Sequence, residues 1–185
     1  MLRVVLTGPE CTGKTTLTER ISHHYGIPFV PEFAVEYLES RKNKKKKYTL
    51  KDLLKIASGQ TSSENFGLET AALTGEKIKL CDTDMLTIKI WAEVVFGKTD
   101  EIIESWINTI AEYKKNENIY LLCSPEGIPW IAHPLRENPN DRHVLFELYE
   151  NLLKKLELNY YILKGDMDAR FNEAKKIIEK NILSN

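Results

Sequence analysis

Short apolar runs alternate with longer segments of helical periodicity along the chain. The apolar runs predict five strands, at Val4–Thr7, Ile27–Val30, Ile78–Asp82, Ile119–Cys123 and Tyr160–Leu163. The periodic segments predict helices at Thr15–Tyr25, Phe33–Ser40, Leu50–Leu73, Leu86–Phe96, Glu101–Tyr113, Arg142–Leu156 and Asp168–Ile182. Strands that are apolar along their whole length and alternate with helices are typical of a parallel sheet covered on both faces. The pattern therefore predicts a three-layer α/β/α fold.

The sequence after the first predicted strand has the pattern of a phosphate-binding P-loop. Residues 8–15 read GPECTGKT and match G-x-x-x-x-G-K-[ST]. Gly8 and Gly13 allow the backbone N–H groups and the following helix N-terminus to approach phosphate oxygens closely. We expect Lys14 to contact the β- and γ-phosphates of ATP and the Thr15 hydroxyl to bind Mg²⁺. The other expected nucleotide contacts are Glu10, Cys11, Thr12 and Thr16. The expected fold is thus a P-loop NTPase with strand order 2-3-1-4-5.

Carboxylates follow the second and third predicted strands. Ligands of a parallel sheet bind at the carboxyl ends of its strands, so these residues are candidates for the site. Asp82 has the position of a Walker-B aspartate and is expected to hold Mg²⁺, unless it forms a turn or a helix cap. Asp84 is expected to bind a substrate hydroxyl or to cap the next helix. Glu32 is expected to take the proton of the acceptor hydroxyl, or else to be a helix N-terminal glutamate.

The segment after the fourth predicted strand is long for a connection within a compact domain. It extends from Ser124 to Arg142 and contains four prolines. Long connections of this kind are often functional, so we predict a lid at approximately residues 124–142. Arg136 and Arg142 are expected either to clamp the transferred phosphoryl group or to pair with surface carboxylates.

Three planar side chains are candidates for stacking on a ring of a ligand. Trp91 and Trp130 are expected to contact the substrate base, although packing in the core explains each equally well. Arg170 follows the last predicted strand and is expected to stack on the adenine of the nucleotide.

Length and composition fit one domain over residues 1–185. Lysine and arginine number 26 against 27 acidic residues, so the net charge of −1 does not favour nucleic acid. Three cysteines without close spacing fit a reducing compartment, and no apolar stretch reaches membrane-spanning length. We expect a cytoplasmic protein without a signal peptide, and a homo-oligomer is compatible with the sequence. The basic tract Arg41–Lys47 is interpreted as a solvated connection, with a phosphate- or membrane-attracting patch as the alternative.

Several motifs together resemble the ribosylnicotinamide kinase domain of the NadR-type proteins and the related small AAA-like ATPases. The resemblance extends over nearly the whole chain. It is carried by residues 8–17, 31–38 (PEFAVEYL), 59–60 (GQ), 81–84 (CDTD), 128–130 (IPW), 134–139 (PLRENP) and 141–142 (DR). It implies transfer of a phosphoryl group from ATP to the ribose 5′-hydroxyl of nicotinamide riboside. It also implies that Asp82 and Asp84 face metal and ribose, that Glu32 faces the acceptor, and that Arg136 and Arg142 belong to the lid.

Two residues depart from the pattern of this family. Val35 stands where the family usually has arginine, and His133 lies where the lid tends to be acidic. If that acidic residue recognises the cationic pyridinium ring, another nucleoside or small metabolite becomes an alternative acceptor. A nucleotide-gated regulatory protein that binds ATP or GTP is a further alternative, because a P-loop specifies the nucleotide and not the acceptor.

Overall fold

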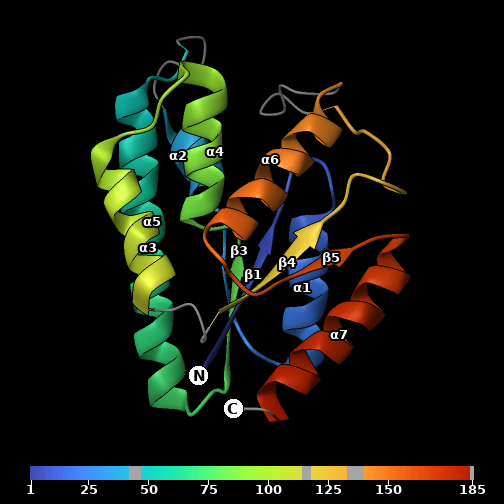
Figure 1. The fold of residues 1–185 in the computed structure, drawn as a ribbon. Helices are drawn as coiled ribbons and strands as arrows, with labels where there is room; N and C mark the ends of the chain where they lie inside the picture. The colour runs from blue at the N-terminus through green and yellow to red at the C-terminus, as the bar shows by residue number, and fades with distance from the viewer. Residues whose placement is uncertain (42–46, 114–117, 133–139, 184–185) are drawn as a thin grey trace.

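The computed structural model describes residues 1–41, 47–113, 118–132 and 140–183. Its strands form one sheet (Figure 1), made of β1 (Leu2–Thr7), β2 (Phe29–Val30), β3 (Ile78–Asp82), β4 (Asn118–Cys123) and β5 (Tyr160–Leu163). Every pair of neighbouring strands is parallel, and the order is β2-β3-β1-β4-β5. The predicted fold class and strand order are therefore confirmed.

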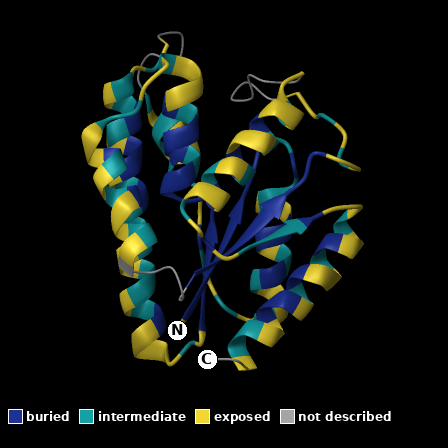
Figure 2. Cartoon of the chain, in the orientation of Figure 1, coloured by how far each residue is buried: buried dark blue, intermediate teal, exposed yellow. Residues whose placement is uncertain are grey.

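Helices cover both faces of this sheet. They are α1 (Lys14–Tyr25), α2 (Phe33–Ser40), α3 (Leu50–Thr74), α4 (Met85–Phe96), α5 (Glu101–Tyr113), α6 (Arg142–Lys155) and α7 (Met167–Leu183). Helices α1 and α7 pack on one face, and α3, α4, α5 and α6 pack on the other. Figure 2 shows the central strands β1, β3 and β4 as a buried layer between the two sets of helices, whereas β5 at the edge is mostly of intermediate burial.

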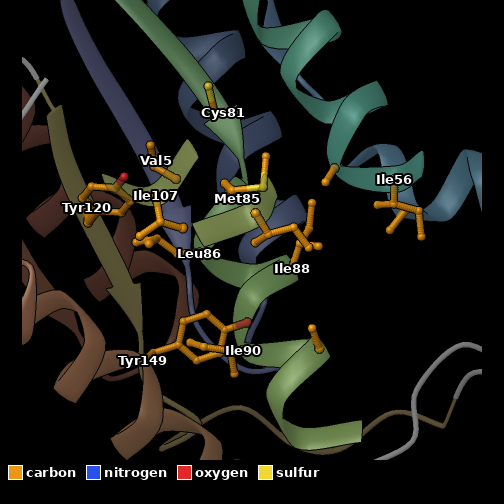
Figure 3. Packing of buried hydrophobic residues seen from close by; sticks show 14 of the residues in the cluster. Val5, Ile56, Cys81, Met85, Leu86, Ile88, Ile90, Ile107, Tyr120 and Tyr149 are labelled. Carbon is orange, nitrogen blue, oxygen red and sulfur yellow. The ribbon is translucent and has the colours of Figure 1, made fainter. Parts of the chain in front are cut away.

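Alternate residues of each strand belong to opposite cores, because successive side chains of a strand point to opposite faces. On β1, Val4 and Leu6 pack towards α1 and α7, whereas Val5 packs towards α3 and α4. All three are fully buried. Figure 3 shows the core between the sheet and α3–α6, in which Val5 and Tyr120 of the sheet pack near Leu86 and Ile88 of α4. Burial on both faces explains why the strands read as continuous apolar runs.

The second strand is shorter than its apolar sequence predicts. We expected Ile27–Val30, whereas β2 contains only Phe29 and Val30. Pro28 and Pro31 flank these two residues, and proline has no N–H to donate to a neighbouring strand. Strand β2 is therefore a short edge strand, and it ends two residues before Glu32.

The long helix α3 runs beside α2 and α4 and begins with a capping box. The Thr49 side chain accepts the N–H of Asp52, and the Asp52 carboxylate accepts the N–H of Thr49. The helix ends at Gly75, which has a φ of 73° and donates its N–H to the carbonyl of Ala71. Within the described ranges, none of the helices combines the length and the apolar character that spanning a membrane requires.

Candidate active site

The P-loop connects β1 to α1 in a conformation that depends on its two glycines. Gly8 has a φ of 127° and Gly13 a φ of 78°. A Cβ atom on Gly8 would lie 2.8 Å from the carbonyl oxygen of Cys123, at the end of β4. The Thr12 hydroxyl donates to the Pro9 carbonyl over 2.9 Å and braces the loop from within. The loop leads directly into the N-terminus of α1, which is the arrangement that binds phosphate.

Lys14 is the first residue of α1, and its ammonium group turns back over the loop. Its Nζ donates to the carbonyls of Gly8 over 3.0 Å and of Pro9 over 2.8 Å. The positive charge is thus held on the P-loop itself. This is the position from which a P-loop lysine serves the phosphates of a nucleotide.

Thr15 and Asp82, the two residues predicted to hold Mg²⁺, form a direct hydrogen bond. The Thr15 hydroxyl donates to Asp82 Oδ2 over 2.6 Å, and Asp82 is buried at the end of β3. The second carboxylate oxygen, Oδ1, is buried without a hydrogen-bond partner among the described residues. Burial raises the pKa of Asp82, whereas the Thr15 hydroxyl and the Lys14 charge lower it. A hydroxyl beside a carboxylate with an unpaired oxygen fits Mg²⁺, which prefers oxygen ligands.

The described residues contain no group of three or more His, Cys, Asp or Glu side chains that could hold a metal.

Glu32 is held at the start of α2, close to the same charged groups. It is the N-cap residue of α2, yet its side chain makes no capping hydrogen bond. Burial raises the pKa of Glu32; the Lys14 charge lowers it, and Asp82 and Glu10 raise it. A carboxylate that does not cap its own helix and interacts with Lys14 and Asp82 favours the predicted acceptor-side position.

Asp84 makes internal contacts instead of the predicted contact with a substrate hydroxyl. Its side chain is fully buried and caps α4 by accepting the N–H of Leu86 over 3.0 Å. It also accepts the Tyr120 hydroxyl over 2.8 Å and Arg3 Nη2 over 3.1 Å. Arg3 in turn pairs with Glu64 of α3 over 2.7 Å. The alternative role as a helix cap is thus the one that the structure supports, because the neighbouring strands supply Asp84 with partners.

Thr83 connects Asp82 to Asp84 in an unusual backbone conformation. Its φ is 68°, in the left-handed region that a β-branched residue rarely adopts. The residue is buried, and its N–H donates to the carbonyl of Leu6 over 3.0 Å. The surrounding structure therefore holds this residue in a strained state.

The described part of the lid rests on the P-loop. Arg142 Nη1 donates to the carbonyls of Cys11 over 3.1 Å and of Ile128 over 2.9 Å. The Cys11 sulfur accepts the N–H of Ile131 over 3.1 Å. Arg142 therefore contacts the backbone of the phosphate-binding loop, and its role as a clamp stays a prediction. The predictions for Arg136 and His133, and for most of the tract Arg41–Lys47, lie outside the described residues.

The three planar side chains occupy different surroundings. Trp130 lies under the guanidinium of Arg142, with 5.8 Å from the guanidinium carbon to the ring centroid. Trp91 donates its Nε1–H to the Tyr48 hydroxyl over 2.8 Å and packs, partly buried, against the core, which favours the packing alternative for this residue.

Arg170 is buried beneath the P-loop and is not placed to stack on a base. Its guanidinium donates to the carbonyls of Gly165 over 2.8 Å, of Thr12 over 3.0 Å and of Glu126 over 2.6 Å. The predicted adenine contact is therefore corrected. Arg170 joins three loops because their carbonyls converge where β1, β4 and β5 end.

Sequence reasoning missed two buried polar residues, Tyr149 and Arg3. Tyr149 of α6 is buried, and the charge of Glu32 contributes to the raised pKa of its hydroxyl. Its position in a helical apolar stripe gave no signal. Arg3 was detectable, since an arginine inside the apolar run Leu2–Leu6 requires a buried carboxylate partner.

A parallel sheet of this order, with a P-loop after β1 and an aspartate at the end of β3, defines a P-loop nucleotide-binding protein. More particularly, the chain belongs to the family described as an AAA domain, whose model matches residues 3–170. A search of curated proteins gave no match.

Solved structures share this fold over almost the entire chain. A NadR protein in complex with NR is 22% identical with a TM-score of 0.75, covering 98% of this chain and 51% of the other. A NadR protein with NAD and AMP-PNP is 21% identical with a TM-score of 0.72, covering 98% and 49%. Thymidylate kinase from Ehrlichia chaffeensis is 13% identical with a TM-score of 0.65, covering 96% and 98%. The chain thus has the fold of P-loop kinases and spans about half the length of the two NadR proteins.

Proposed function

We propose that residues 1–185 act as an ATP-dependent kinase that phosphorylates the ribose 5′-hydroxyl of nicotinamide riboside, giving nicotinamide mononucleotide. The observation that carries this proposal is the grouping of Lys14, the Thr15–Asp82 pair and Glu32 at the carboxyl ends of β1, β2 and β3. The similarity to NadR proteins, one of which was solved with NR, supports the choice of acceptor.

The P-loop provides the donor half of the reaction. The loop binds the triphosphate of ATP through its N–H groups, with Lys14 on the β- and γ-phosphates. Thr15 and Asp82 would hold Mg²⁺, which neutralises charge on the phosphates when bound. Positioning and charge neutralisation account for most of the catalysis in phosphoryl transfer.

Glu32 provides the acceptor half. Its carboxylate accepts the proton of the ribose 5′-hydroxyl as the hydroxyl oxygen forms its bond to the γ-phosphorus. The bond between the γ-phosphorus and the bridging oxygen of the β-phosphate breaks, and ADP leaves with that electron pair. The raised pKa of Glu32 makes its carboxylate a stronger base than an exposed glutamate.

The lid completes the site over residues 124–142. Arg142, already on the P-loop, stabilises the charge of the transferred group, and Arg136 is proposed as the second clamp. Trp130, half-buried beside Arg142, is the proposed platform for the pyridine ring.

A second acceptor class is also supported. Val35 stands where the family usually has arginine, so α2 lacks that positive charge in this chain. The residue lies on the exposed side of α2, with 43% of its surface accessible. Deoxyadenosine kinase from M. mycoides shares the fold with a TM-score of 0.54 and 14% identity. A kinase for another nucleoside would use the same Lys14, Asp82 and Glu32.

The test is an ADP-release assay with ATP and Mg²⁺ across nicotinamide riboside, ribonucleosides and deoxynucleosides, with the products identified by mass spectrometry. We expect nicotinamide riboside to give the highest kcat/KM. Lys14→Ala should reduce turnover on the order of 10²-fold or more, whereas Lys55→Ala, an exposed lysine on α3, should not. Turnover of another nucleoside only would select the second acceptor class. Failure to phosphorylate any member of the panel would reject the kinase assignment.

A further inference from the structure

Helix α3 meets the start of α2 at two adjacent residues, Gly59 and Gln60. Gln60 is buried, with 2% of its surface exposed, and its Oε1 accepts the N–H of Phe33 over 2.9 Å. Phe33 is the first residue of α2 and directly follows Glu32. The first N–H groups of a helix have no partner inside the helix, so an external acceptor at this point fixes where the helix begins.

Gly59 provides space for the ring of the same phenylalanine. A Cβ atom at position 59 would overlap the ring carbons Cε1, Cδ1 and Cζ of Phe33. Gly59 lies in the middle of α3, where glycine is disfavoured relative to alanine and where no left-handed backbone requires it. The glycine is therefore explained by the close approach of the Phe33 ring.

These two contacts act on different parts of Phe33, the residue next to Glu32. One holds the backbone of Phe33 through its N–H, and the other holds its side chain in a notch on α3. The Glu32 side chain makes no capping bond of its own. The start of α2, next to Glu32, is thus attached to α3 through Phe33.

The same helix is also connected, through Arg3, to Asp84, the residue that caps α4. Glu64 lies one turn after Gln60 and pairs with Arg3, which pairs with Asp84 two residues beyond Asp82. Residues four apart lie on the same face of a helix. One face of α3 therefore contacts the start of α2 directly and the start of α4 through Arg3.

We propose that Gly59 and Gln60 are positioning residues that hold Glu32 at the distance from Asp82 and Lys14 that phosphoryl transfer requires. The inference rests on the proposed kinase function for its catalytic consequence, but its structural content is independent of any activity. Gln60 fixes the backbone after Glu32, and Gly59 fixes the ring that follows it.

The structural arm measures hydrogen exchange at the Phe33 amide by NMR. Gln60→Met removes the acceptor with little change of volume, and protection of the Phe33 N–H should fall about tenfold. Gln60→Glu keeps a side-chain oxygen for this bond, and the Gln60 Nε2 that it replaces has no hydrogen-bond partner among the described residues. Protection should therefore be retained. Ser58→Ala, the exposed neighbour on α3, is the matched control. Unchanged protection in Gln60→Met overturns the proposal.

The catalytic arm separates acceptor positioning from general damage. Gln60→Met should lower kcat about tenfold or more, because a displaced base loses alignment with the hydroxyl. Its Kd for ADP should stay within about twofold, since ADP contacts the P-loop and not Glu32. Gly59→Ala should show the same separation, and Gly59→Ala combined with Phe33→Ala should behave like Phe33→Ala alone, because the overlap is relieved. Equal losses of ADP affinity and kcat, or additive effects in the double variant, overturn the positioning role.

The two arms also distinguish failure of this inference from failure of the proposed function. A wild-type protein without turnover on any nucleoside, combined with reduced Phe33 protection in Gln60→Met, rejects the kinase assignment and retains the attachment of the Glu32 junction to α3. An active wild type with undiminished kcat in Gln60→Met rejects the inference and retains the kinase.

Discussion

Replacing Arg170 by methionine should weaken the structure beneath the P-loop. The Arg170 side chain is fully buried, and its three nitrogens donate to the carbonyls of Gly165, Thr12 and Glu126. Methionine fills a similar volume but donates no hydrogen bond, so the three carbonyls lose their partner together. The P-loop would lose the contact that ties Thr12 to the loops after β4 and β5.

The expected loss in the free energy of unfolding depends on how many carbonyls are left unpaired and on how deeply each is buried. The hydrogen bond to the Thr12 carbonyl is buried, and leaving that carbonyl unpaired costs about 1–3 kcal/mol. The bonds to Gly165 and Glu126 are only partly buried, so water can replace the arginine and each contributes about 0.5–1.5 kcal/mol. The total loss of stability is therefore about 2–6 kcal/mol. That is a large share of the roughly 5–15 kcal/mol by which a domain is stable. Urea unfolding followed by tryptophan fluorescence measures it, and the midpoint should fall while the slope m stays unchanged.

Arg20→Met is the matched control. Arg20 pairs with Asp168 over 2.6 Å, but its side chain is 40% exposed and that of Asp168 78% exposed. Exposed ion pairs contribute about 0–1 kcal/mol, so this variant should unfold close to the wild type. The reasoning is refuted if Arg170→Met matches Arg20→Met in stability and loses affinity for ATP while retaining it for tripolyphosphate. That result would return Arg170 to the role of base contact.

Three further predictions concern charge at the site and at a helix end. Arg142→Ala should slow turnover on the order of 10³-fold if Arg142 stabilises the transferred phosphoryl group, and a loss smaller than about tenfold in a steady-state assay contradicts the clamp. Because the pKa of Glu32 is raised, the base form should be lost as the pH falls through a value above that of an ordinary glutamate. The acid limb of kcat/KM should then lie at that higher pH, and an acid limb unchanged in Glu32→Gln would contradict the assignment. Tyr37 and Thr49 lower the pKa of Asp52 from 3.8 to about 2, so its stabilising effect is complete above pH 3.8 and is lost as the pH falls through about 2. Asp52→Asn should therefore cost about 1 kcal/mol at pH 6 in urea unfolding, and a difference from wild type that persists unchanged at pH 2 argues against the capping role.

The parts of the site that are local in sequence could be predicted from sequence. The P-loop needs glycines at fixed spacing from Lys14, and burial of the strands on both faces makes them apolar, so both leave a pattern in consecutive residues. The sequence also predicted that Thr15 and Asp82 lie close together, because neighbouring parallel strands bring their carboxyl ends together.

The roles of Asp84 and Arg170 depended on partners that sequence spacing does not reveal. Asp84 is occupied by Tyr120 and Arg3, which lie on the two strands beyond β3, and the sequence does not state which side chains of those strands face it. Arg170 is occupied by backbone carbonyls, which have no signature in residue type at all. Both residues follow the carboxyl end of a strand, where ligand contacts are common. In both cases the side chain is bonded to other parts of the protein instead.

Thr83 has a consequence for attempts to stabilise this protein. A non-glycine residue held at a φ of 68° costs about 1–3 kcal/mol, and glycine would avoid most of that cost. Thr83→Gly would relieve this strain, but it would also delete a buried side chain and give the unfolded chain more freedom, so relief of strain raises the melting temperature only where it exceeds these two costs. The substitution would also free the backbone between the aspartate that pairs with Thr15 and the aspartate that is anchored to Arg3. An engineer who wants a fast catalyst should therefore leave Thr83 unchanged, even where Thr83→Gly raises the melting temperature.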